Sequence, residues 1–569
     1  MKGFQDSKNN YPNPKKKKNT KFYNSNENIN LFKKATNLQN KGELVQASNI
    51  YNILLKNNFR TEQFFLNYAI VCQYLKDTKS AIILFKEAIK INPKNFIPFF
   101  KMGFILNNIG KFYEAYPFAK KAIELDPNPW QSYHNLIKIL INLNKPKEAI
   151  NIAMNAKNLF TTNHLFSDLL GEIYKSIGNF EEANKFFKDS ISLAPNDDEA
   201  LYSFANFLVG IGNKKDSIKF LNKILDINPN HSMSYYLFST LINIEKDQDI
   251  KHKIIDLKIK NFKTNKDRYN ILFSKSHIYH KLKEFKKSSE ILKQANDIKL
   301  LDRPSNLKEV IKLSEKIKNK TNLDKSFDKA IFKYLRDIFI IGLPRSGSTL
   351  VESIIGMNKD VHNLGENSIL RNALFESEKS NYCDVDKIYF NYSQEFSEKK
   401  YTTNKMLSNY MQIPYILAKL KHSKVIYTFR NPLDNLLSIY RAKFTGVGNE
   451  YSSSLKDSAE YYMHQFKMMS FYREKFKNYI YFLSYDKLVN DPEPEIRKII
   501  DWLGFGWEDC YLHTDKSKQG FFTASNVQVR SSINNKSVGQ WKKYTDLMQE
   551  PITLFKKNNF KLTSFENLI

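Results

Sequence analysis

The chain has 569 residues, of which 42% are hydrophobic and 14% aromatic, and its formal net charge is +29. This composition excludes a wholly disordered chain, and the length predicts more than one domain, because single cores rarely grow past about 250–300 residues. The three cysteines, Cys72, Cys383 and Cys510, are widely scattered. They indicate neither a disulfide framework nor a metal site, and a reducing compartment is expected.

The positive charge is spread along the whole chain and is not gathered in one stripe. We interpret it as a solvated basic surface that steers anionic ligands, and we predict no nucleic-acid partner. Residues 1–27 have the composition of a disordered basic tail, with no apolar segment behind the run Lys15 to Lys18. No stretch of about 18 apolar residues occurs, so neither a signal peptide nor a transmembrane segment is predicted and a cytoplasmic location is expected.

Regularly spaced prolines mark an internal repeat in the first half of the chain. Pro93, Pro127, Pro195 and Pro229 are separated by 34, 68 and 34 residues, and each follows an apolar-periodic helical segment. Small residues, which let two antiparallel helices approach closely, recur at the eighth and twentieth places of the unit. They are Ala69, Gly103, Gly171 and Ala205 at the eighth place, and Ala81, Ala115, Ala149, Ala183 and Ser217 at the twentieth. The proline stops the second helix of each unit.

This pattern resembles the tetratricopeptide repeat over residues 28–302, in about eight units, with a slip in phase near Tyr269. The resemblance implies an all-α superhelix whose concave surface binds a protein or peptide. A spacer or an oligomerisation surface is the alternative. Residues 303–336 are expected to form a linker and one helix.

The composition changes at Asp337, where we predict a second, α/β domain that extends to residue 569. The apolar run 338–341 predicts a buried parallel strand, and residues 350–355 predict a helix. Between them lies Gly342-Leu343-Pro344-Arg345-Ser346-Gly347-Ser348-Thr349. A strand, a glycine-containing loop and a helix N-terminus form the arrangement in which backbone N–H groups bind a phosphate. The spacing is close to that of a P-loop, but Ser348 occupies the position of the lysine that nucleotide triphosphatases need.

A second strand-to-helix unit follows at residues 424–443. Residues 424–429 predict a strand, and Pro432 suits the first position of a helix. Arg430 ends the strand at the sheet edge where open α/β sheets bind ligands, and Ser438 lies two turns into the helix. Taken singly, Arg430 is better explained as the partner of a carboxylate, and Ser438 as an exposed helix serine.

The two units together resemble the sulfotransferase superfamily over about residues 337–545, and most closely its protein-tyrosine branch and the bacterial tetratricopeptide-repeat sulfotransferases. The resemblance implies a P-loop-like α/β domain with a parallel sheet, and 3′-phosphoadenosine 5′-phosphosulfate (PAPS) as a co-substrate that needs no metal. The first loop is expected to bind the 5′-phosphosulfate through Arg345, Ser346, Gly347, Ser348 and Thr349. The second unit is expected to bind the 3′-phosphate through Arg430 and Ser438.

Further segments match this branch. Leu364-Gly365-Glu366 resembles the segment whose glutamate is the general base, and Thr403-Asn404-Lys405-Met406 resembles the one whose lysine stabilises the transition state. Tyr485 matches a nucleotide-binding tyrosine. Ser525 matches a second transition-state stabiliser in a late segment that runs to Trp541. Two positions depart from the pattern, because Ala442 and Gln540 stand where the family has basic residues.

These residue types suit sulfuryl transfer, which requires positioning and charge stabilisation more than covalent chemistry. A carboxylate accepts the acceptor's proton, and Lys405 and Ser525 meet the charge that develops on the leaving oxygen. His362 is the alternative base, because small-molecule sulfotransferases use a histidine. We favour Glu366 and interpret His362 as a surface residue.

The sequence therefore predicts a PAPS-dependent sulfotransferase that modifies a hydroxyl group. The resemblance implies peptidyl tyrosine as the acceptor, and a saccharide or lipid hydroxyl is the alternative. A P-loop kinase or NTPase is a second hypothesis, and a repeat-based adaptor with an inactive nucleotide-binding domain is a third. Since repeats contact mainly their neighbours, we expect the transferase site to be built without them.

Overall fold

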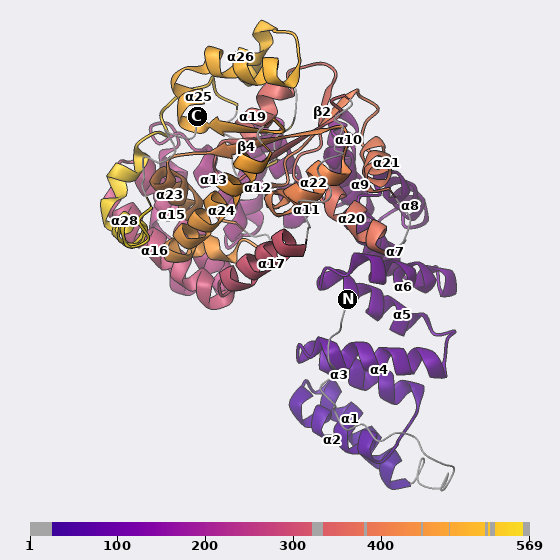
Figure 1. The fold of residues 1–569 in the computed structure, drawn as a ribbon. Helices are drawn as coiled ribbons and strands as arrows, with labels where there is room; N and C mark the ends of the chain where they lie inside the picture. Colours follow the sequence, from indigo (N-terminus) through magenta and orange to yellow (C-terminus); the bar gives the residue numbers. More distant parts are fainter. Residues whose placement is uncertain are drawn as a thin grey trace. The chain divides into compact units, whose positions relative to one another are not determined.

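The computed structural model describes residues 26–320, 334–379, 384–444, 448–476, 478–517, 520, 522–523 and 530–560 (Figure 1). Within the chain two compact units are distinguished, Met1–Ile139 and Leu140–Ile569. Most of the predicted basic tail and Ser525 lie outside the described residues.

The first unit is a stack of antiparallel helix pairs. Its helices are α1 (Asn26–Asn40), α2 (Leu44–Lys56), α3 (Glu62–Tyr74), α4 (Thr78–Ile91), α5 (Phe96–Asn108), α6 (Phe112–Leu125) and most of α7 (Trp130–Asn142). Pro93 and Pro127 stand two residues beyond the ends of α4 and α6, as the repeat pattern predicts. A Cβ on Gly103 would lie 3.1 Å from the backbone nitrogen of Ala119. The small residue is therefore needed where the paired helices approach.

The second unit continues the repeats. Its repeat helices are α8 (Pro146–Leu159), α9 (His164–Ser176), α10 (Phe180–Leu193), α11 (Asp198–Gly210), α12 (Lys214–Ile227), α13 (Ser232–Leu241), α14 (Gln248–Asp256), α15 (Asn265–Lys281) and α16 (Phe285–Asp302). Helix α14 is short, and the 3₁₀ turn η1 (Ile259–Asn261) separates it from α15. This irregular unit accounts for the slip in phase near Tyr269. Helix α17 (Leu307–Lys320) is the helix expected between the repeats and the α/β domain.

A five-stranded, all-parallel sheet forms the centre of the C-terminal domain. Its strands are β1 (Asp337–Gly342), β2 (Val361–Asn363), β3 (Tyr401–Asn404), β4 (Ser423–Phe429) and β5 (Ile480–Ser484), in the spatial order β2-β3-β1-β4-β5. The strands predicted from residues 338–341 and 424–429 are confirmed as β1 and β4, which pair in parallel. Both therefore end at the same edge of the sheet.

Helices cover both faces of this sheet (Figure 1). They are α19 (Ser348–Ile355), α20 (Ile369–Lys379), α21 (Val385–Gln394), α22 (Ile413–Lys419), α23 (Pro432–Arg441), α24 (Leu455–Lys475), α25 (Tyr485–Asn490), α26 (Pro492–Leu503) and α28 (Thr545–Lys557). Side chains of β1 alternate between the two faces. Ile338 and Ile340 pack with residues of α19 and α26, whereas Phe339 and Ile341 pack with residues of α20 to α24. This alternation explains why β1 is apolar throughout.

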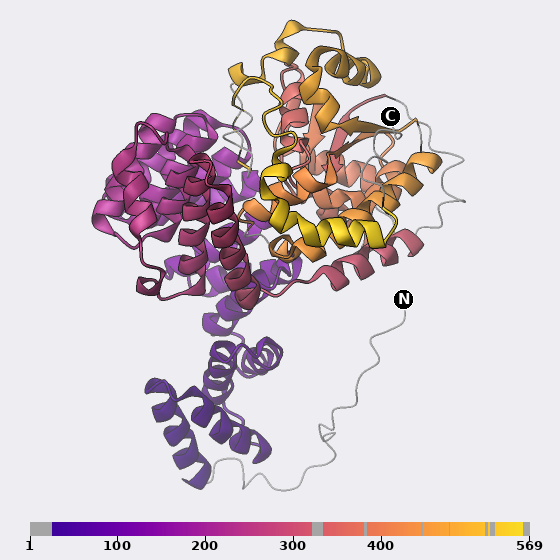
Figure 2. The same cartoon turned by 90° about the vertical axis from the view of Figure 1, so that its left-hand side faces the viewer.

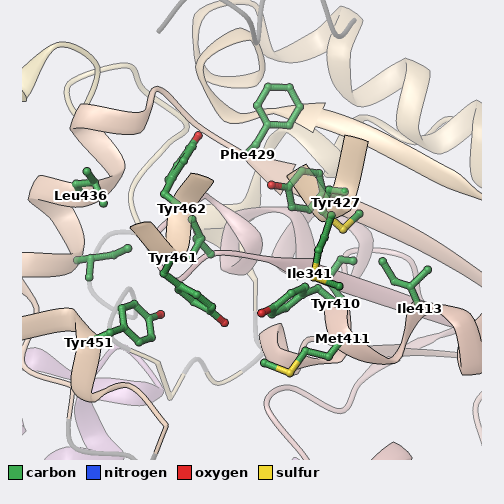
Figure 3. Close-up of a cluster of buried hydrophobic side chains, with 14 of the residues drawn as sticks. Ile341, Tyr410, Met411, Ile413, Tyr427, Phe429, Leu436, Tyr451, Tyr461 and Tyr462 are labelled. Carbon is green, nitrogen blue, oxygen red and sulfur yellow. The ribbon is translucent and has the colours of Figure 1, made fainter. Parts of the chain in front are cut away.

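Tyrosines dominate one part of the core (Figure 3), including Tyr410, Tyr427, Tyr451, Tyr461 and Tyr462. The ring centroids of Tyr451 and Tyr461 are 4.4 Å apart. The hydroxyl of Tyr462 donates a hydrogen bond of 2.7 Å to the backbone oxygen of Arg430. The core thus fixes the backbone immediately after β4.

The last repeat helices share this core. Tyr269, Phe273 and Leu292, from α15 and α16, belong to the same buried cluster as β1 and β4. Asn296 donates a hydrogen bond of 3.1 Å to the Tyr440 carbonyl, and Arg303 pairs with Glu450 at 2.6 Å. In Figure 2 the helices of residues 269–302 accordingly lie against the orange and yellow segments of this unit. Within the described ranges, no helix combines the length and apolarity needed to cross a membrane.

Candidate active site

The loop between β1 and α19 has a backbone that only certain residues accept. Gly342 and Gly347 have φ values of 152° and 98°, and Arg345 has a φ of 68°. A Cβ on Gly342 would lie 2.4 Å from the Thr428 carbonyl oxygen, and one on Gly347 would lie 2.3 Å from the Tyr485 ring. Both glycines are therefore required, because the loop packs directly against β4 and α25.

Two hydrogen bonds tie this loop to the second strand-to-helix unit. The hydroxyls of Ser346 and Thr428 lie 2.7 Å apart, and Asn435 donates a bond of 3.0 Å to the Pro344 carbonyl. Ser346 is thus engaged within the protein. Ser348 and Thr349 begin α19, where unpaired N–H groups and the helix dipole favour an anion.

The two predicted arginines lie at the same end of the sheet. Arg345 donates from Nε to the Ser438 hydroxyl at 3.0 Å. The buried Arg430 donates to the Ser537 carbonyl and lies 4.8 Å from the centroid of the Tyr485 ring. Its Nε is buried and has no hydrogen-bond partner among the described residues. Burial, and next the charge of Arg430, lower the pKa of Arg345 to about 10, so this end has the electrostatics of an anion site.

A buried lysine and two glutamates form a second cluster. Lys405 Nζ lies 2.6 Å from Glu366 Oε1; the lysine side chain is 0% exposed and that of Glu366 50% exposed. On the inner side Glu352 accepts hydrogen bonds from the Gly365 N–H at 3.2 Å and the Thr403 hydroxyl at 3.1 Å. Burial raises the pKa of Glu352, and the charge of Lys405 opposes that rise.

Glu352 was not singled out in the sequence. The sequence contained a hint, since Glu352 is the single charged residue in the apolar run 350–355. Burying that run also buries the carboxylate, which then needs partners within the protein. A buried acid with satisfied hydrogen bonds holds the Leu364-Gly365-Glu366 segment in place.

One cleft of about 1670 Å³ brings most of the predicted site residues together. Its lining includes Arg345, Gly347, Ser348, Thr349, Glu366, Arg430, Ser438 and Tyr485. Two of the predicted residues do not line the cleft: Ser346 is buried, with its hydroxyl against Thr428, and the buried Lys405 contacts Glu366. Ser525 falls outside the described residues. In the part of the chain that the structure describes, no group of three or more metal-ligating side chains occurs.

Repeat helices also line this cleft, contrary to the expectation that the site is built without them. Tyr202 and Asn206 come from α11, Met233 and Tyr236 from α13, and His280 from α15. A repeat pattern reports how helices pack within the array. It does not tell which outer face meets another domain.

The family departure at Ala442 is flanked by two cations of the cleft lining, Arg441 and Lys443. Lys443 Nζ is 3.0 Å from Asn270 Oδ1 and 3.9 Å from the centroid of the Tyr236 ring. Burial lowers the pKa of Lys443 to about 7. This lysine therefore reaches from the α/β domain into the repeats.

The late segment is fixed to the first turn of α23. The Asp434 carboxylate accepts hydrogen bonds from the N–H groups of Gly539 at 2.6 Å and Trp541 at 2.9 Å. The hydroxyls of Tyr485 and Ser537 lie 2.7 Å apart. Gln540, the second departure, lines the cleft.

His362 differs from the expectation of a surface residue. It lies on β2, half-buried, and its ring is 3.4 Å from the position that a Cβ on Gly178 would take. Burial lowers the pKa of His362 to about 4. It is not among the residues that line the cleft.

Comparisons with known proteins agree with this arrangement. Residues 337–509 match the profile described as "Sulfotransferase family", and residues 63–95, 99–129, 178–237 and 269–300 match tetratricopeptide repeat profiles. An uncharacterized protein of Aquifex aeolicus is 28% identical over 251 residues, which are 40% of this chain and 33% of the relative.

A protein-tyrosine sulfotransferase of Drosophila melanogaster is 24% identical over 245 residues, which are 38% of this chain and 49% of that protein. A putative protein-tyrosine sulfotransferase of Caenorhabditis briggsae is 25% identical over 228 residues, which are 36% of this chain and 80% of that protein. The chain thus spans between a third and half of the length of the Aquifex and Drosophila relatives. The chain thus carries tetratricopeptide repeats followed by a C-terminal domain that matches the sulfotransferase family over residues 337–509.

Proposed function

We propose that the protein is a sulfotransferase that moves a sulfuryl group from PAPS to an acceptor hydroxyl, with a transferase domain over residues 337–569. One observation carries the proposal. Arg345, Arg430 and Glu366 line the same cleft, and Glu366 lies 2.6 Å from the buried Lys405. Anion binding and proton acceptance are the two tasks that this reaction requires.

In this proposal the first loop holds the 5′-phosphosulfate. The residues that bind it are Arg345, Ser346, Gly347, Ser348 and Thr349, through backbone N–H groups, hydroxyls and the guanidinium. Arg430 and Ser438 hold the 3′-phosphate, and Tyr485 packs between the loop and Arg430. The unpartnered Nε of Arg430 supports this assignment, because a buried guanidinium donor is costly unless a ligand accepts from it.

Glu366 is the proposed general base. Its carboxylate takes the proton of the acceptor hydroxyl while the oxygen–sulfur bond forms, and the bond from sulfur to the bridging oxygen of the 5′-phosphate breaks. The 2.6 Å contact with Lys405 orients the Glu366 carboxylate. Lys405 and Ser525 are proposed to stabilise the charge on the leaving oxygen.

A tyrosyl hydroxyl within a polypeptide is the proposed acceptor, and the repeats are proposed to bind that polypeptide. The support is the similarity to proteins named protein-tyrosine sulfotransferase, together with repeat side chains in the lining of the cleft. A saccharide or lipid hydroxyl is the alternative.

Calorimetry with adenosine 3′,5′-bisphosphate tests the proposal. We expect binding without magnesium, and weaker binding of adenosine 5′-monophosphate, which lacks the 3′-phosphate. Preference for ATP with magnesium would instead indicate a kinase or NTPase, and binding of neither would indicate an adaptor. Incubating a lysate with sulfur-labelled PAPS then identifies the acceptor class from the labelled species.

A further inference from the structure

Helix α11 of the repeats faces the transferase domain on two sides. Tyr202 and Asn206 line the cleft. One residue further along, Phe207 and then Gly210 contact a segment of the C-terminal domain instead. The same helix therefore lines the cleft through Tyr202 and Asn206 and, through Phe207 and Gly210, forms a support for a segment of the C-terminal domain.

Phe522 is the side chain that this support receives. Its ring stacks on Phe207 with centroids 6.2 Å apart and planes 11° apart, and it lies 5.9 Å from the ring of Phe180. Lys175 Nζ lies 5.2 Å from the centroid of the Phe522 ring. A Cβ on Gly210 would come within 2.0 Å of that ring, so Phe522 occupies the space that the missing side chain leaves.

Arg530 makes a second attachment at the same turn. Its guanidinium donates to the Gly210 carbonyl, and its Cδ is 3.1 Å from the position of a Cβ on Gly212. The turn Gly210–Gly212, which connects α11 to α12, thus contacts the C-terminal domain at two positions of the chain. The Phe522 contact depends on the absence of a side chain at Gly210, and the Arg530 contact on its absence at Gly212.

Thr523 links this support to the phosphate loop. It follows Phe522 in the chain, and its hydroxyl lies 3.3 Å from that of Thr349. Thr349 is buried in the first turn of α19, beside the N–H groups that face the proposed phosphate. Two consecutive residues therefore contact the repeats and the phosphate loop.

We propose that the Gly210–Gly212 turn of the repeats is a positioning element of the transferase site. By holding Phe522 and Arg530 it keeps Thr523 against Thr349, so the order of the phosphate loop, and with it the nucleotide affinity, depends on the repeats. A preorganised loop binds more tightly because less ordering accompanies binding. The role of the nucleotide rests on the proposed function, whereas the order of the loop does not.

The test is Gly210→Ala in the full chain. Alanine is favoured over glycine in a helix, so the substitution does not weaken α11 through its propensity. The added methyl displaces Phe522, and we expect the affinity for adenosine 3′,5′-bisphosphate to fall about tenfold, which corresponds to about 1.4 kcal/mol. Amide hydrogen exchange over residues 343–351 should become faster without any ligand. Gly506→Ala is the matched control, because a Cβ there meets nothing within 4 Å.

A compensating variant separates positioning from general damage. Phe522→Leu makes room for the methyl, so Gly210→Ala with Phe522→Leu should regain part of the affinity and of the loop protection. If Gly210→Ala does not fold, Phe522→Ala is measured instead and should show the same two losses. The inference would be overturned if the variant that folds had the same amide exchange rates over residues 343–351 and the same affinity for adenosine 3′,5′-bisphosphate as the unmodified protein. If the parent binds no bisphosphate, the proposed function fails, and the exchange rates alone then decide this inference in either direction.

Discussion

Two parts of the cleft differ in how buried charge is compensated. We call the part at Arg345 and Arg430 the nucleotide end, and the part at Glu366 and Lys405 the other end. At the nucleotide end, burial and the neighbouring Arg430 lower the pKa of Arg345, and Arg430 keeps a buried Nε without a partner among the described residues. At the other end, Lys405 is fully buried but lies against Glu366 and near Glu352. Buried cations are stable only when paired, so the first end favours an anionic ligand, whereas the second is compensated by the protein itself.

The comparison indicates what each end can do. The end where the charge of Arg430 adds to that of Arg345 gains most from phosphate or sulfate groups. A compensated end holds the Glu366 carboxylate in position to accept a proton.

Glu366→Gln should have the largest effect. The amide keeps the size and hydrogen-bonding capacity of the carboxylate but cannot accept the hydroxyl proton. We expect turnover to fall by about 10²–10⁴-fold, the range for loss of general-base catalysis. Affinity for adenosine 3′,5′-bisphosphate, measured by calorimetry, should remain that of the parent, because the other end binds the nucleotide.

His362→Ala is the control for the base. Its ring lies beside Gly178 and outside the cleft lining, so turnover should change little. An inactive His362→Ala together with an active Glu366→Gln would transfer the role of base to the histidine and would remove the main support for a tyrosyl acceptor.

Lys405→Met should lower turnover by about 10²–10³-fold, through lost stabilisation of the leaving oxygen. It should also lower the thermal midpoint, because Glu352 stays buried without its cation. Adding Glu352→Gln should restore the midpoint but not the turnover. Recovery of both in the double variant would show that Lys405 acts only through folding.

Arg430→Ala should act on binding. We expect the affinity for adenosine 3′,5′-bisphosphate to fall about 10–100-fold, the range for a hydrogen bond to a charged group, and that for adenosine 5′-monophosphate to change much less. Arg371→Ala, which removes another arginine of the cleft lining, is the matched control and should affect neither ligand. Equal weakening of both nucleotides by Arg430→Ala would contradict the 3′-phosphate assignment.

The smallest effect concerns two histidines of the repeat helix α15, His277 and His280. Burial is the main cause that lowers the pKa of His277 to about 3 and that of His280 to about 2. In the unfolded chain both take up a proton near pH 6.5. Because the unfolded state then binds more protons, stability should fall as the pH drops from about 6.5 towards 3.

His280→Gln retains a hydrogen-bonding group for the Tyr544 hydroxyl, which lies 2.7 Å from the histidine Nδ1. The thermal midpoint of this variant should therefore decline less steeply between pH 7 and 5. If the thermal midpoint of the variant declined with pH as steeply as that of the unmodified protein, His280 would not be neutral in the folded protein.

Local patterns predicted most of the fold. Strands β1 and β4, the loop between Gly342 and Thr349, and the 34-residue repeat are each defined by neighbouring residues, and all are found in the structure. The placement of Arg345 and Arg430 at one sheet edge followed from the parallel pairing of two strands, whereas the contact of Arg345 with Ser438 was not predicted. Glu352 was missed because a single acid in an apolar helix has many explanations. The repeat wall was missed because contacts such as Phe522 with Gly210 join residues that are far apart in the chain.

The core shared by α15, α16 and the sheet affects the order in which the protein can be made. Tyr269, Phe273 and Leu292 leave the ribosome well before β4, α24 and α28, which complete their buried cluster. The earlier helix pairs can fold on local contacts as they emerge. These three apolar side chains, in contrast, stay exposed until more than 200 further residues, up to Tyr544 and Phe555, have been synthesised. During synthesis the last repeats are therefore the part of the array most exposed to aggregation and most dependent on chaperones.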